Sequence, residues 1–240
     1  MTKVDMLVLA AHPDDAELGC SGTIAGAIAE GKKVAIVDFT QGEMGTRGTP
    51  EVRLEESADS AKVLGLIGRE NLGFRDVYFT NDEEHQRAVV RMIRKYRPEV
   101  ILANALEDRH PDHGKGAAVA RDAVFMSGLR MLETLDDAGN AQEPWRPQVM
   151  YHYIQDRYME PDFVVDVTDH WETKLASIRA FRSQFYDPNS DEPDSYISSP
   201  EFMEFVEARS HVMGHKIGVK HGEGFVAYRK LGVRSVFDLA

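Results

Sequence analysis

Cysteine and long apolar runs are what this sequence lacks most clearly. Cys20 is the single cysteine among 240 residues, so the chain can form neither an internal disulfide nor a zinc site built from several thiolates. We interpret Cys20 as a small packed residue. One thiol fits a reducing compartment, and we expect a cytoplasmic protein. The apolar stretch near the start is too short for a signal peptide, and no stretch is long enough to span a membrane.

Basic residues are also scarce relative to acidic ones. The chain has 28 Lys and Arg against 40 Asp and Glu, a formal net charge of −12 and a pI near 5.2. This balance argues against nucleic acid or an anionic membrane as the main partner, because both select basic surfaces. It does not exclude a small acidic substrate, since a few arginines can dominate the local field. We therefore expect a small-molecule partner.

Two clusters of His and Asp stand out instead. The sequence His-Pro-Asp-Asp at residues 12–15 follows the apolar run 6–9, and Arg-His-Pro-Asp-His at residues 109–113 follows the apolar run 100–103. Each apolar run predicts a buried strand, and in an open α/β sheet ligands bind where strands end. A turn with an Asp capping the next helix would explain the Pro and one Asp of the first cluster. It does not explain two such clusters, so we favour a metal site.

The rest of the chain predicts an α/β fold. Strand and helix patterns alternate, which calls for a mostly parallel sheet with helices on both faces, a Rossmann-like three-layer α/β/α arrangement. No repeat or long linker divides the chain, so we expect one domain over residues 1–240. Thr168 is the expected N-cap of its helix, and residues 187–200 read as a surface loop. We predict strands at residues 6–11, 33–39, 71–74, 100–103, 149–154, 163–167 and 224–228, and helices at 18–30, 51–64, 82–96, 114–125, 169–181 and 200–216.

The residues of the two clusters suit an open metal site. Catalytic zinc sites carry three protein ligands and leave a position for water. The clusters offer more groups than that, namely His12, Asp14, Asp15, His110, Asp112 and His113. Three would bind the metal, and the others can act on the water or on a leaving group. This is the equipment of metal-assisted hydrolysis of an amide or ester.

At these residues the chain resembles a known family. Ala-His-Pro-Asp-Asp-Ala-Glu at residues 11–17 and His-Pro-Asp-His at residues 110–113 resemble the LmbE/PIG-L-like zinc-dependent N-acetylglucosaminide deacetylases. Residues 38–43 and 53–56 resemble further segments of that family, and the resemblance covers nearly the whole chain. Residues 183–185, 214–220 and 223–225 resemble the bacillithiol-pathway branch, which deacetylates N-acetylglucosaminyl-malate.

The resemblance implies a role for each cluster residue. It gives His12, Asp15 and His113 as zinc ligands, Asp14 as general base, and His110 as acid or partner of the tetrahedral intermediate. Zn2+ is the expected metal. Iron(II) or cobalt fits similar ligands, so Fe2+ is an alternative. Asp112 either orients a His ring or caps the helix that follows.

Other polar residues are candidates for substrate binding. The resemblance favours Arg53, although an Arg among helical carboxylates is usually a solvated charge pair. Arg109 adjoins His110 and could grip a malate carboxylate, and Arg146 is a more remote candidate for the same task. Glu43 and Asp76 fall on loops where they could hold sugar hydroxyls or be merely exposed.

Several residues near the C-terminus receive a plainer interpretation. His211, His215 and His221 show no ligand spacing with the two clusters and read as ordinary residues. The aromatic stretch from Phe202 to Val212 suggests core packing or a subunit contact, and the resemblance implies a homo-oligomer.

Together these observations predict a zinc-dependent N-deacetylase of an N-acetylglucosamine conjugate, with GlcNAc-malate of bacillithiol biosynthesis as the expected substrate. The alternatives are a deacetylase or amidase of a chito-oligosaccharide or thiol-sugar conjugate, and a non-catalytic sugar-binding module. A nucleotide-binding protein is disfavoured, because no Gly-rich phosphate loop follows the first strand.

Overall fold

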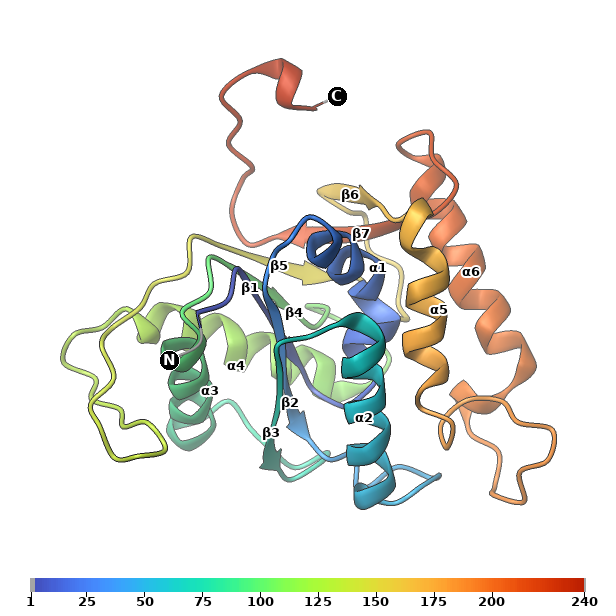
Figure 1. Cartoon of the computed structure of the whole chain (residues 1–240), viewed down its shortest axis with the longest axis horizontal. Coiled ribbons are helices and arrows are strands. Elements are labelled where there is room, and N and C mark those ends of the chain that lie inside the picture. Colours follow the sequence, from blue (N-terminus) through green and yellow to red (C-terminus); the bar gives the residue numbers. More distant parts are fainter. Residues whose placement is uncertain (1–2, 240) are drawn as a thin grey trace.

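The computed structural model describes residues 3–239 as an alternation of strands and helices around one sheet (Figure 1). The strands are β1 (Met6–Ala10), β2 (Val34–Thr40), β3 (Gly68–Phe74), β4 (Val100–Ala103), β5 (Val149–Tyr153), β6 (Phe163–Asp166) and β7 (Gly222–Ala227). The α-helices are α1 (Asp15–Ala29), α2 (Pro50–Leu64), α3 (Glu83–Tyr96), α4 (Pro111–Ser127), α5 (Trp171–Arg179) and α6 (Pro200–His215). The predicted domain includes residues 1, 2 and 240, which lie outside the described part of the chain.

The sheet confirms the predicted architecture. Its strand order is β3-β2-β1-β4-β5-β7-β6. The pairs from β3 to β5 are parallel, whereas β7 runs antiparallel to both of its neighbours. The chain moves outward from β1 to β3 and then crosses back to place β4 on the other side of β1. The strand order therefore reverses between β1 and β4, which is where open α/β sheets form a crevice for ligands.

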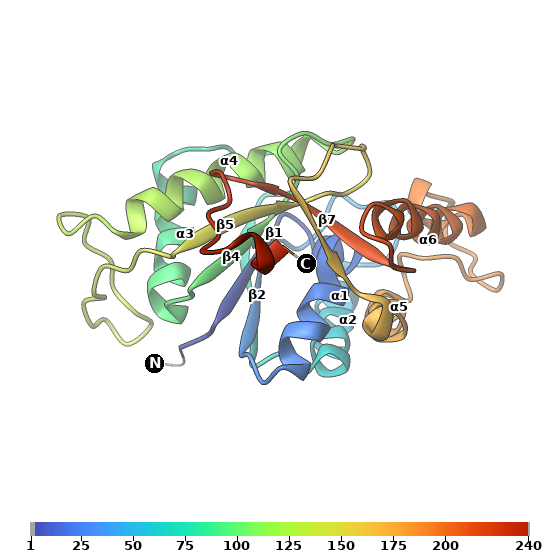
Figure 2. The ribbon, with the colours of Figure 1, turned by 90° about the horizontal axis from the view of Figure 1, so that it is seen from above.

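Helices cover both faces of the sheet (Figure 2), and alternate residues of β1 pack against them. On β1, Leu7 and Leu9 join the core formed with α3 and α4, while Val8 and Ala10 join the core formed with α1. Strand β2 is buried along its whole length. This two-sided burial explains its apolar run from Val34 to Val37, whereas the buried Asp38 that follows is paired with Arg69. The covered sheet is the predicted three-layer arrangement.

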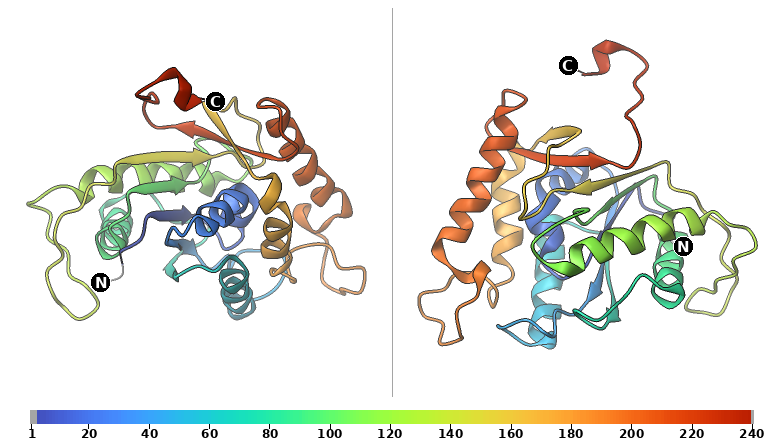
Figure 3. Two further views of the ribbon diagram at one scale, coloured as in Figure 1. Left: turned by 45° about the horizontal axis from the view of Figure 1, so that its top comes forward. Right: turned by 180° about the vertical axis from the view of Figure 1, so that it is seen from behind.

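Helices α5 and α6 form a further layer beside α1 and α2 (Figure 3). Their contact is a separate hydrophobic cluster that includes Trp171, Phe181, Phe202 and Val206. Phe202 and Val206 are thus used within the chain, whereas Phe205 and Val212 of the same helix are exposed. The predicted subunit contact at residues 202–212 is left with these exposed side chains, and the homo-oligomer stays a prediction.

The structure corrects several helix boundaries. Helix α1 begins at Asp15 rather than at residue 18, and α4 begins at Pro111 rather than at 114. Both helices therefore start inside the His/Asp clusters, which sequence patterns assigned to loops. Thr168 does not cap α5, because it begins a short 3-10 helix that precedes Trp171. Among residues 3–239, no helix is both long and apolar enough to cross a membrane.

Candidate active site

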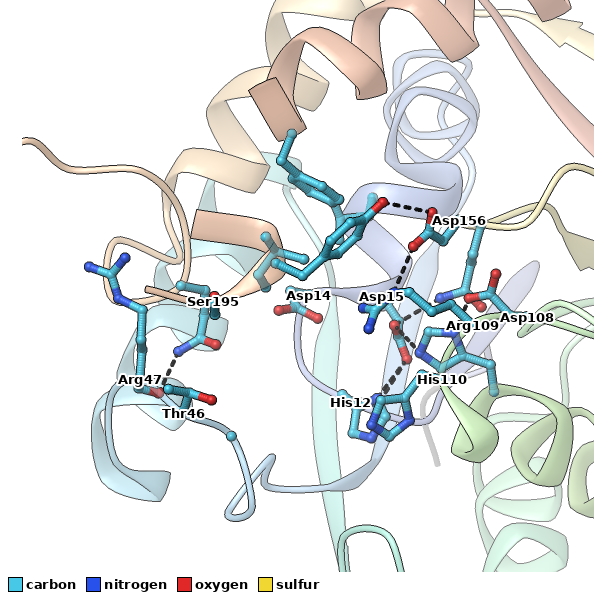
Figure 4. A pocket seen from close by; sticks show the side chains of 18 of the residues that line it. His12, Asp14, Asp15, Thr46, Arg47, Asp108, Arg109, His110, Asp156 and Ser195 are labelled. Atoms are coloured by element: carbon cyan, nitrogen blue, oxygen red, sulfur yellow. Dashed lines mark hydrogen bonds and ion pairs between the residues drawn. The ribbon is translucent and has the colours of Figure 1, made fainter. Parts of the chain in front are cut away.

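The two His/Asp clusters meet in a pocket at the carboxyl ends of β1 and β4 (Figure 4). The cavity has a volume of ≈ 330 Å³, which is within the range of small-molecule sites. Its walls come from both halves of the chain, because Gln184, Tyr196 and Arg209 also line it. The strand reversal between β1 and β4 thus positions the predicted chemistry at the edge where the sheet opens.

The first cluster makes an unusual entry into α1. Asp14 occupies the N-cap position with φ at 107°, in the left-handed region, and within the described chain its side chain makes no capping hydrogen bond. This backbone conformation is uncommon for a residue other than glycine and is often found at functional sites. The segment is a turn, as the alternative interpretation expected, but the predicted capping is wrong, because the Asp14 side chain lines the pocket and makes no capping hydrogen bond.

The second cluster forms the first turn of α4. His110 is the N-cap, and its Nδ1 accepts a hydrogen bond from the backbone N–H of Asp112 at 3.3 Å. The interpretation of Asp112 as the N-cap is therefore wrong. Its carboxylate instead accepts from Val77 N and Lys115 Nζ and lies 3.5 Å from His12 Nε2.

The three predicted metal ligands converge. One carboxylate oxygen of Asp15 lies 3.3 Å from His12 Nδ1, and the other lies 3.0 Å from His113 Nε2. All three residues are buried. Ring nitrogens of His12, His110 and His113 also lie within 4.8 Å of one another. Two imidazoles in contact with one carboxylate are a donor set that suits a divalent metal.

The neighbours of these residues fit that use. Asp76 lies 3.1 Å from His12 Nε2, and Asp108 bonds His113 Nδ1. Each imidazole thus offers one N–H to a carboxylate and directs its other nitrogen toward Asp15, which is the arrangement that fixes metal-binding histidines. Asp15 itself accepts hydrogen bonds from Asn104 and Gln155.

Electrostatics among these groups is strong. Burial alone would lower the pKa of His113, yet the charge of Asp15 and the bond to Asp108 raise it to about 9. Burial likewise opposes the rise in the pKa of His12, which its three neighbouring carboxylates bring about. The same contacts with His113 and His12 hold the pKa of Asp15 low against burial. The carboxylates around the two imidazoles therefore favour positive charge at this place, and a bound cation would supply it.

Asp14 stands next to this set but is held by a different partner. Arg53, from α2, donates to Asp14 Oδ2 at 2.9 Å and to the carbonyl oxygen of Pro13. Burial raises the pKa of Asp14 to about 7, although the charge of Arg53 acts to lower it. Side chains of both residues are buried in the pocket wall. A carboxylate with a pKa near neutrality, beside a candidate metal site, has the properties of a general base.

His110 is kept neutral and in one tautomer. Burial, with the nearby charges of His12 and His113, lowers its pKa to about 4. Because its Nδ1 accepts the N–H of Asp112, its proton is on Nε2. His110 lines the pocket and can thus present an N–H donor to bound substrate.

The pocket rim is rich in arginine. Arg109 is half-exposed, bonds Asp156 at 2.8 Å and lies over the ring of Tyr196. Arg47 and Arg209 also line the pocket, and neither was singled out in the sequence. They are contributed by a Gly/Thr-rich loop and by α6, where the sequence carries no motif. Asp108 was not predicted either, although its position two residues before His110 could have indicated a carboxylate close to the second cluster.

The other candidate residues lie in different places. Glu43 is exposed and accepts from the backbone N–H of Asp76, outside the pocket lining. Asp76 lines the pocket, but one of its carboxylate oxygens bonds His12. Arg146 packs against Gly128 and bonds the carbonyl of Phe125, away from the pocket. Cys20 is buried in the core, where burial raises the pKa of its thiol, as expected for a packed residue.

Comparison with known proteins places this chain in a family. A model of the PIG-L family, described as GlcNAc-PI de-N-acetylase, matches residues 7–124. The diacetylchitobiose deacetylase of Thermococcus kodakarensis is 31% identical over 75% of this chain and 70% of its own. A 1D-myo-inositol 2-acetamido-2-deoxy-alpha-D-glucopyranoside deacetylase of Saccharopolyspora erythraea is 28% identical over 82% of this chain and 89% of its own.

A solved structure agrees over the full fold. A conserved protein from Thermus thermophilus superposes with a TM-score of 0.83 and 37% identity, covering 96% of this chain and 98% of that one. The relatives confirm the predicted family. The bacillithiol branch stays a prediction, because the names of the matched deacetylases give other substrates. The chain therefore belongs to the PIG-L family of deacetylases and is a hydrolase of that family.

Proposed function

We propose that the protein is a zinc-dependent N-deacetylase that hydrolyses the acetamide of an N-acetylglucosamine conjugate with an anionic aglycone, such as GlcNAc-malate. The observation that carries this proposal is the placement of Asp14. Asp14 lies beside His12, Asp15 and His113, which contact one another, but its own partner is Arg53. Because Asp14 is not one of the proposed metal ligands, its carboxylate can act as a base. A non-catalytic binding module would need no such carboxylate.

The chain's residues divide the reaction among them. His12, Asp15 and His113 would hold the metal, with Asp76 and Asp108 fixing the imidazoles. A divalent metal bound there would polarise the acetyl carbonyl and make water a better nucleophile. Asp14 then accepts the proton of the attacking water. The Nε2–H of His110 donates to the oxygen on which negative charge develops. Asp14, now protonated, can return the proton to the departing sugar amine, which frees acetate.

The arginines support an anionic aglycone. Arg47, Arg109 and Arg209 all line one pocket of a chain whose net charge is −12. Each already has a partner within the chain: Arg47 bonds Ser190 and Glu192, Arg109 bonds Asp156, and Arg209 bonds the carbonyl oxygens of Gln155 and Leu18. Arginine binds carboxylates through paired N–H donors. A malate group attached to the sugar would supply two carboxylates for this rim, and for this reason we favour GlcNAc-malate over an uncharged conjugate.

The test is acetate release from a panel of substrates by protein of known metal content. GlcNAc-malate, GlcNAc-inositol, diacetylchitobiose and free GlcNAc would be compared at equal concentration. We expect release from all conjugates that fit, with the highest kcat/KM for GlcNAc-malate. No acetate from any of them would refute the deacetylase proposal, and equal use of GlcNAc and GlcNAc-malate would refute the anionic aglycone alone.

A second candidate substrate is a chito-oligosaccharide. The 31% identical relative named as a diacetylchitobiose deacetylase favours it. The half-exposed Tyr196 on the pocket rim offers a ring on which a second sugar could stack. The same panel decides between the two, because this candidate requires diacetylchitobiose to exceed GlcNAc-malate in kcat/KM.

A further inference from the structure

A second group of potential metal ligands lies near the C-terminal end of α6. Glu207 and His211 are one helical turn apart, and their side chains approach within 3.9 Å (His211 Nε2 to Glu207 Oε1). His221, in the connection that leads from α6 to β7, places its ring 4.6 Å from that of His211, centroid to centroid. One ligand atom from each of the three residues lies within 4.8 Å of the other two. Sequence spacing did not reveal this group, because its third member follows a turn of the chain.

His221 is the informative member. It is 1% exposed, and its Nε2 is buried without a hydrogen-bond partner among the described residues. Buried polar atoms of this kind are rare and require an explanation. The ring is held in place by stacking on Trp171, with centroids 4.2 Å apart and planes within 4° of parallel. The unsatisfied nitrogen is therefore rigidly positioned.

Ser210 determines which nitrogen carries the proton. The Ser210 hydroxyl donates to the carbonyl oxygen of Glu207, so its oxygen accepts from His221 Nδ1 at 2.8 Å. His221 thus has Nδ1–H, and its buried Nε2 has a free lone pair. Metal-binding histidines are commonly prepared in this way, with one ring N–H fixed by a neighbour and the other nitrogen free for the ion.

This group is separate from the candidate active site. Arg209 lines the pocket, whereas Glu207 and His211 are exposed and do not line it. Residues two positions from Arg209 on either side project from the opposite face of the helix. None of the three residues contributes to the His/Asp clusters at β1 and β4.

We propose that Glu207, His211 and His221 form a second divalent-metal site, with zinc as the preferred ion. Two imidazoles and one carboxylate are a common zinc donor set, and the exposed side of the group leaves room for water as a further ligand. The ion would join α6 to the segment before β7, whose His221 stacks on Trp171 of α5. Its expected effect is to stabilise this outer layer and not to take part in the reaction.

The experiment counts zinc ions per chain by elemental analysis after dialysis and measures their affinity by calorimetry. We expect two ions for the wild type and one for His211→Ala. Loss of a ligand should lower the zinc affinity of this site by more than the roughly 10- to 100-fold that loss of a supporting contact costs. His215→Ala is the matched control, because His215 is an exposed histidine on the same helix outside the group. It should retain both ions. Glu207→Gln should weaken the same site without removing an imidazole.

Variants of the first site separate this inference from the proposed function. His113→Ala should retain one ion, and adding His211→Ala should remove it. In the His113→Ala protein, zinc should still raise the melting temperature, and His211→Ala should abolish that shift. If wild type and His211→Ala bind the same number of ions with the same affinity, the second site does not exist. If the wild type binds a single ion, and that ion is lost in His211→Ala but kept in His113→Ala, the second site stands and the zinc mechanism of the first site fails.

Discussion

Arg53 donates to Asp14 Oδ2 at 2.9 Å and also to the carbonyl oxygen of Pro13, just before it. One guanidinium thus fixes both the carboxylate and the backbone of a residue with a left-handed φ of 107°. The family resemblance assigned Arg53 to substrate binding, and the plainer interpretation was a solvated charge pair. The solvated pair is wrong, because Arg53 is 5% exposed and orients the candidate base in the pocket wall. Its contact with substrate stays a prediction.

Replacement of Asp14 tests its role as base. Asp14→Asn keeps the shape of the side chain but cannot accept a proton, so we expect kcat to fall by roughly 10²- to 10⁴-fold. The zinc content should remain at the wild-type value, because Asp14 is outside the ligand set. Metal analysis and steady-state kinetics on the same preparation check both points. Turnover close to wild type would assign the base to another residue.

Replacement of Arg53 should move the pH profile. The charge of Arg53 lowers the pKa of Asp14, so Arg53→Gln should raise that pKa. Because the base acts in its deprotonated form, the acid limb of kcat/KM should shift to higher pH. Arg53→Lys retains a charge and should therefore show a smaller shift than Arg53→Gln. An acid limb at the same pH in Arg53→Gln and wild type would contradict this coupling.

Removal of the first metal should abolish activity reversibly. Chelation should inactivate the enzyme, and added zinc should restore turnover, since the three ligands leave a position for water. His12→Ala should lose the ion at this site and cannot be rescued at the same zinc concentration. Asp108→Asn tests the supporting contact, and we expect metal affinity to fall about 10- to 100-fold while the ion can still bind. Full activity after removal of all metal would refute the mechanism.

The sequence predicted those parts of the protein that depend on local pattern. Strand and helix alternation was sufficient for the parallel sheet, and the position of His12 and His113 after apolar runs was sufficient to place them at one sheet edge. The helix starts at Asp15 and Pro111 were missed because the first turns carry polar pocket residues instead of an apolar stripe. Arg209 and Tyr196 could not be found, because tertiary contacts between segments far apart in the chain bring them to the pocket.

The close approach of Gly214 and Gly222 should make the C-terminal layer sensitive to one methyl group. A Cβ at Gly214 would lie 2.7 Å from the carbonyl oxygen of Val219 and 3.0 Å from the backbone nitrogen of His221. Backbone atoms cannot swing aside, so we expect Gly214→Ala to destabilise the protein by about 1–3 kcal/mol. Replacing glycine by alanine within a helix is by itself favourable by about 1 kcal/mol. We expect the cost of the clash with backbone atoms to be larger than this gain. Thermal unfolding checks the result.

Gly232→Ala is the control for this prediction, because a Cβ there meets nothing within 4 Å and its φ lies outside the left-handed region. Its melting temperature should stay close to that of the wild type. A Gly214→Ala protein as stable as the Gly232→Ala protein would mean that the connection between α6 and β7 relaxes readily.

The last prediction concerns Arg109 and the aglycone. Its side chain is 50% exposed and already bonds Asp156 at 2.8 Å, so a substrate carboxylate must compete with that pair and with water. A hydrogen bond to a charged group contributes about 1.5–3 kcal/mol when desolvated, whereas an exposed ion pair contributes about 0.2–1 kcal/mol. We therefore expect Arg109→Ala to reduce the preference for GlcNAc-malate over GlcNAc by about tenfold, near 1.4 kcal/mol.

The matched control is Arg146→Ala, since Arg146 is an exposed arginine outside the pocket lining. Comparing kcat/KM for both substrates in the three proteins makes the test: activity on free GlcNAc should change little in either variant. A preference reduced equally by both substitutions would indicate a general charge effect, and a preference unchanged in Arg109→Ala would leave Arg47 and Arg209 as the remaining rim cations to hold the malate group.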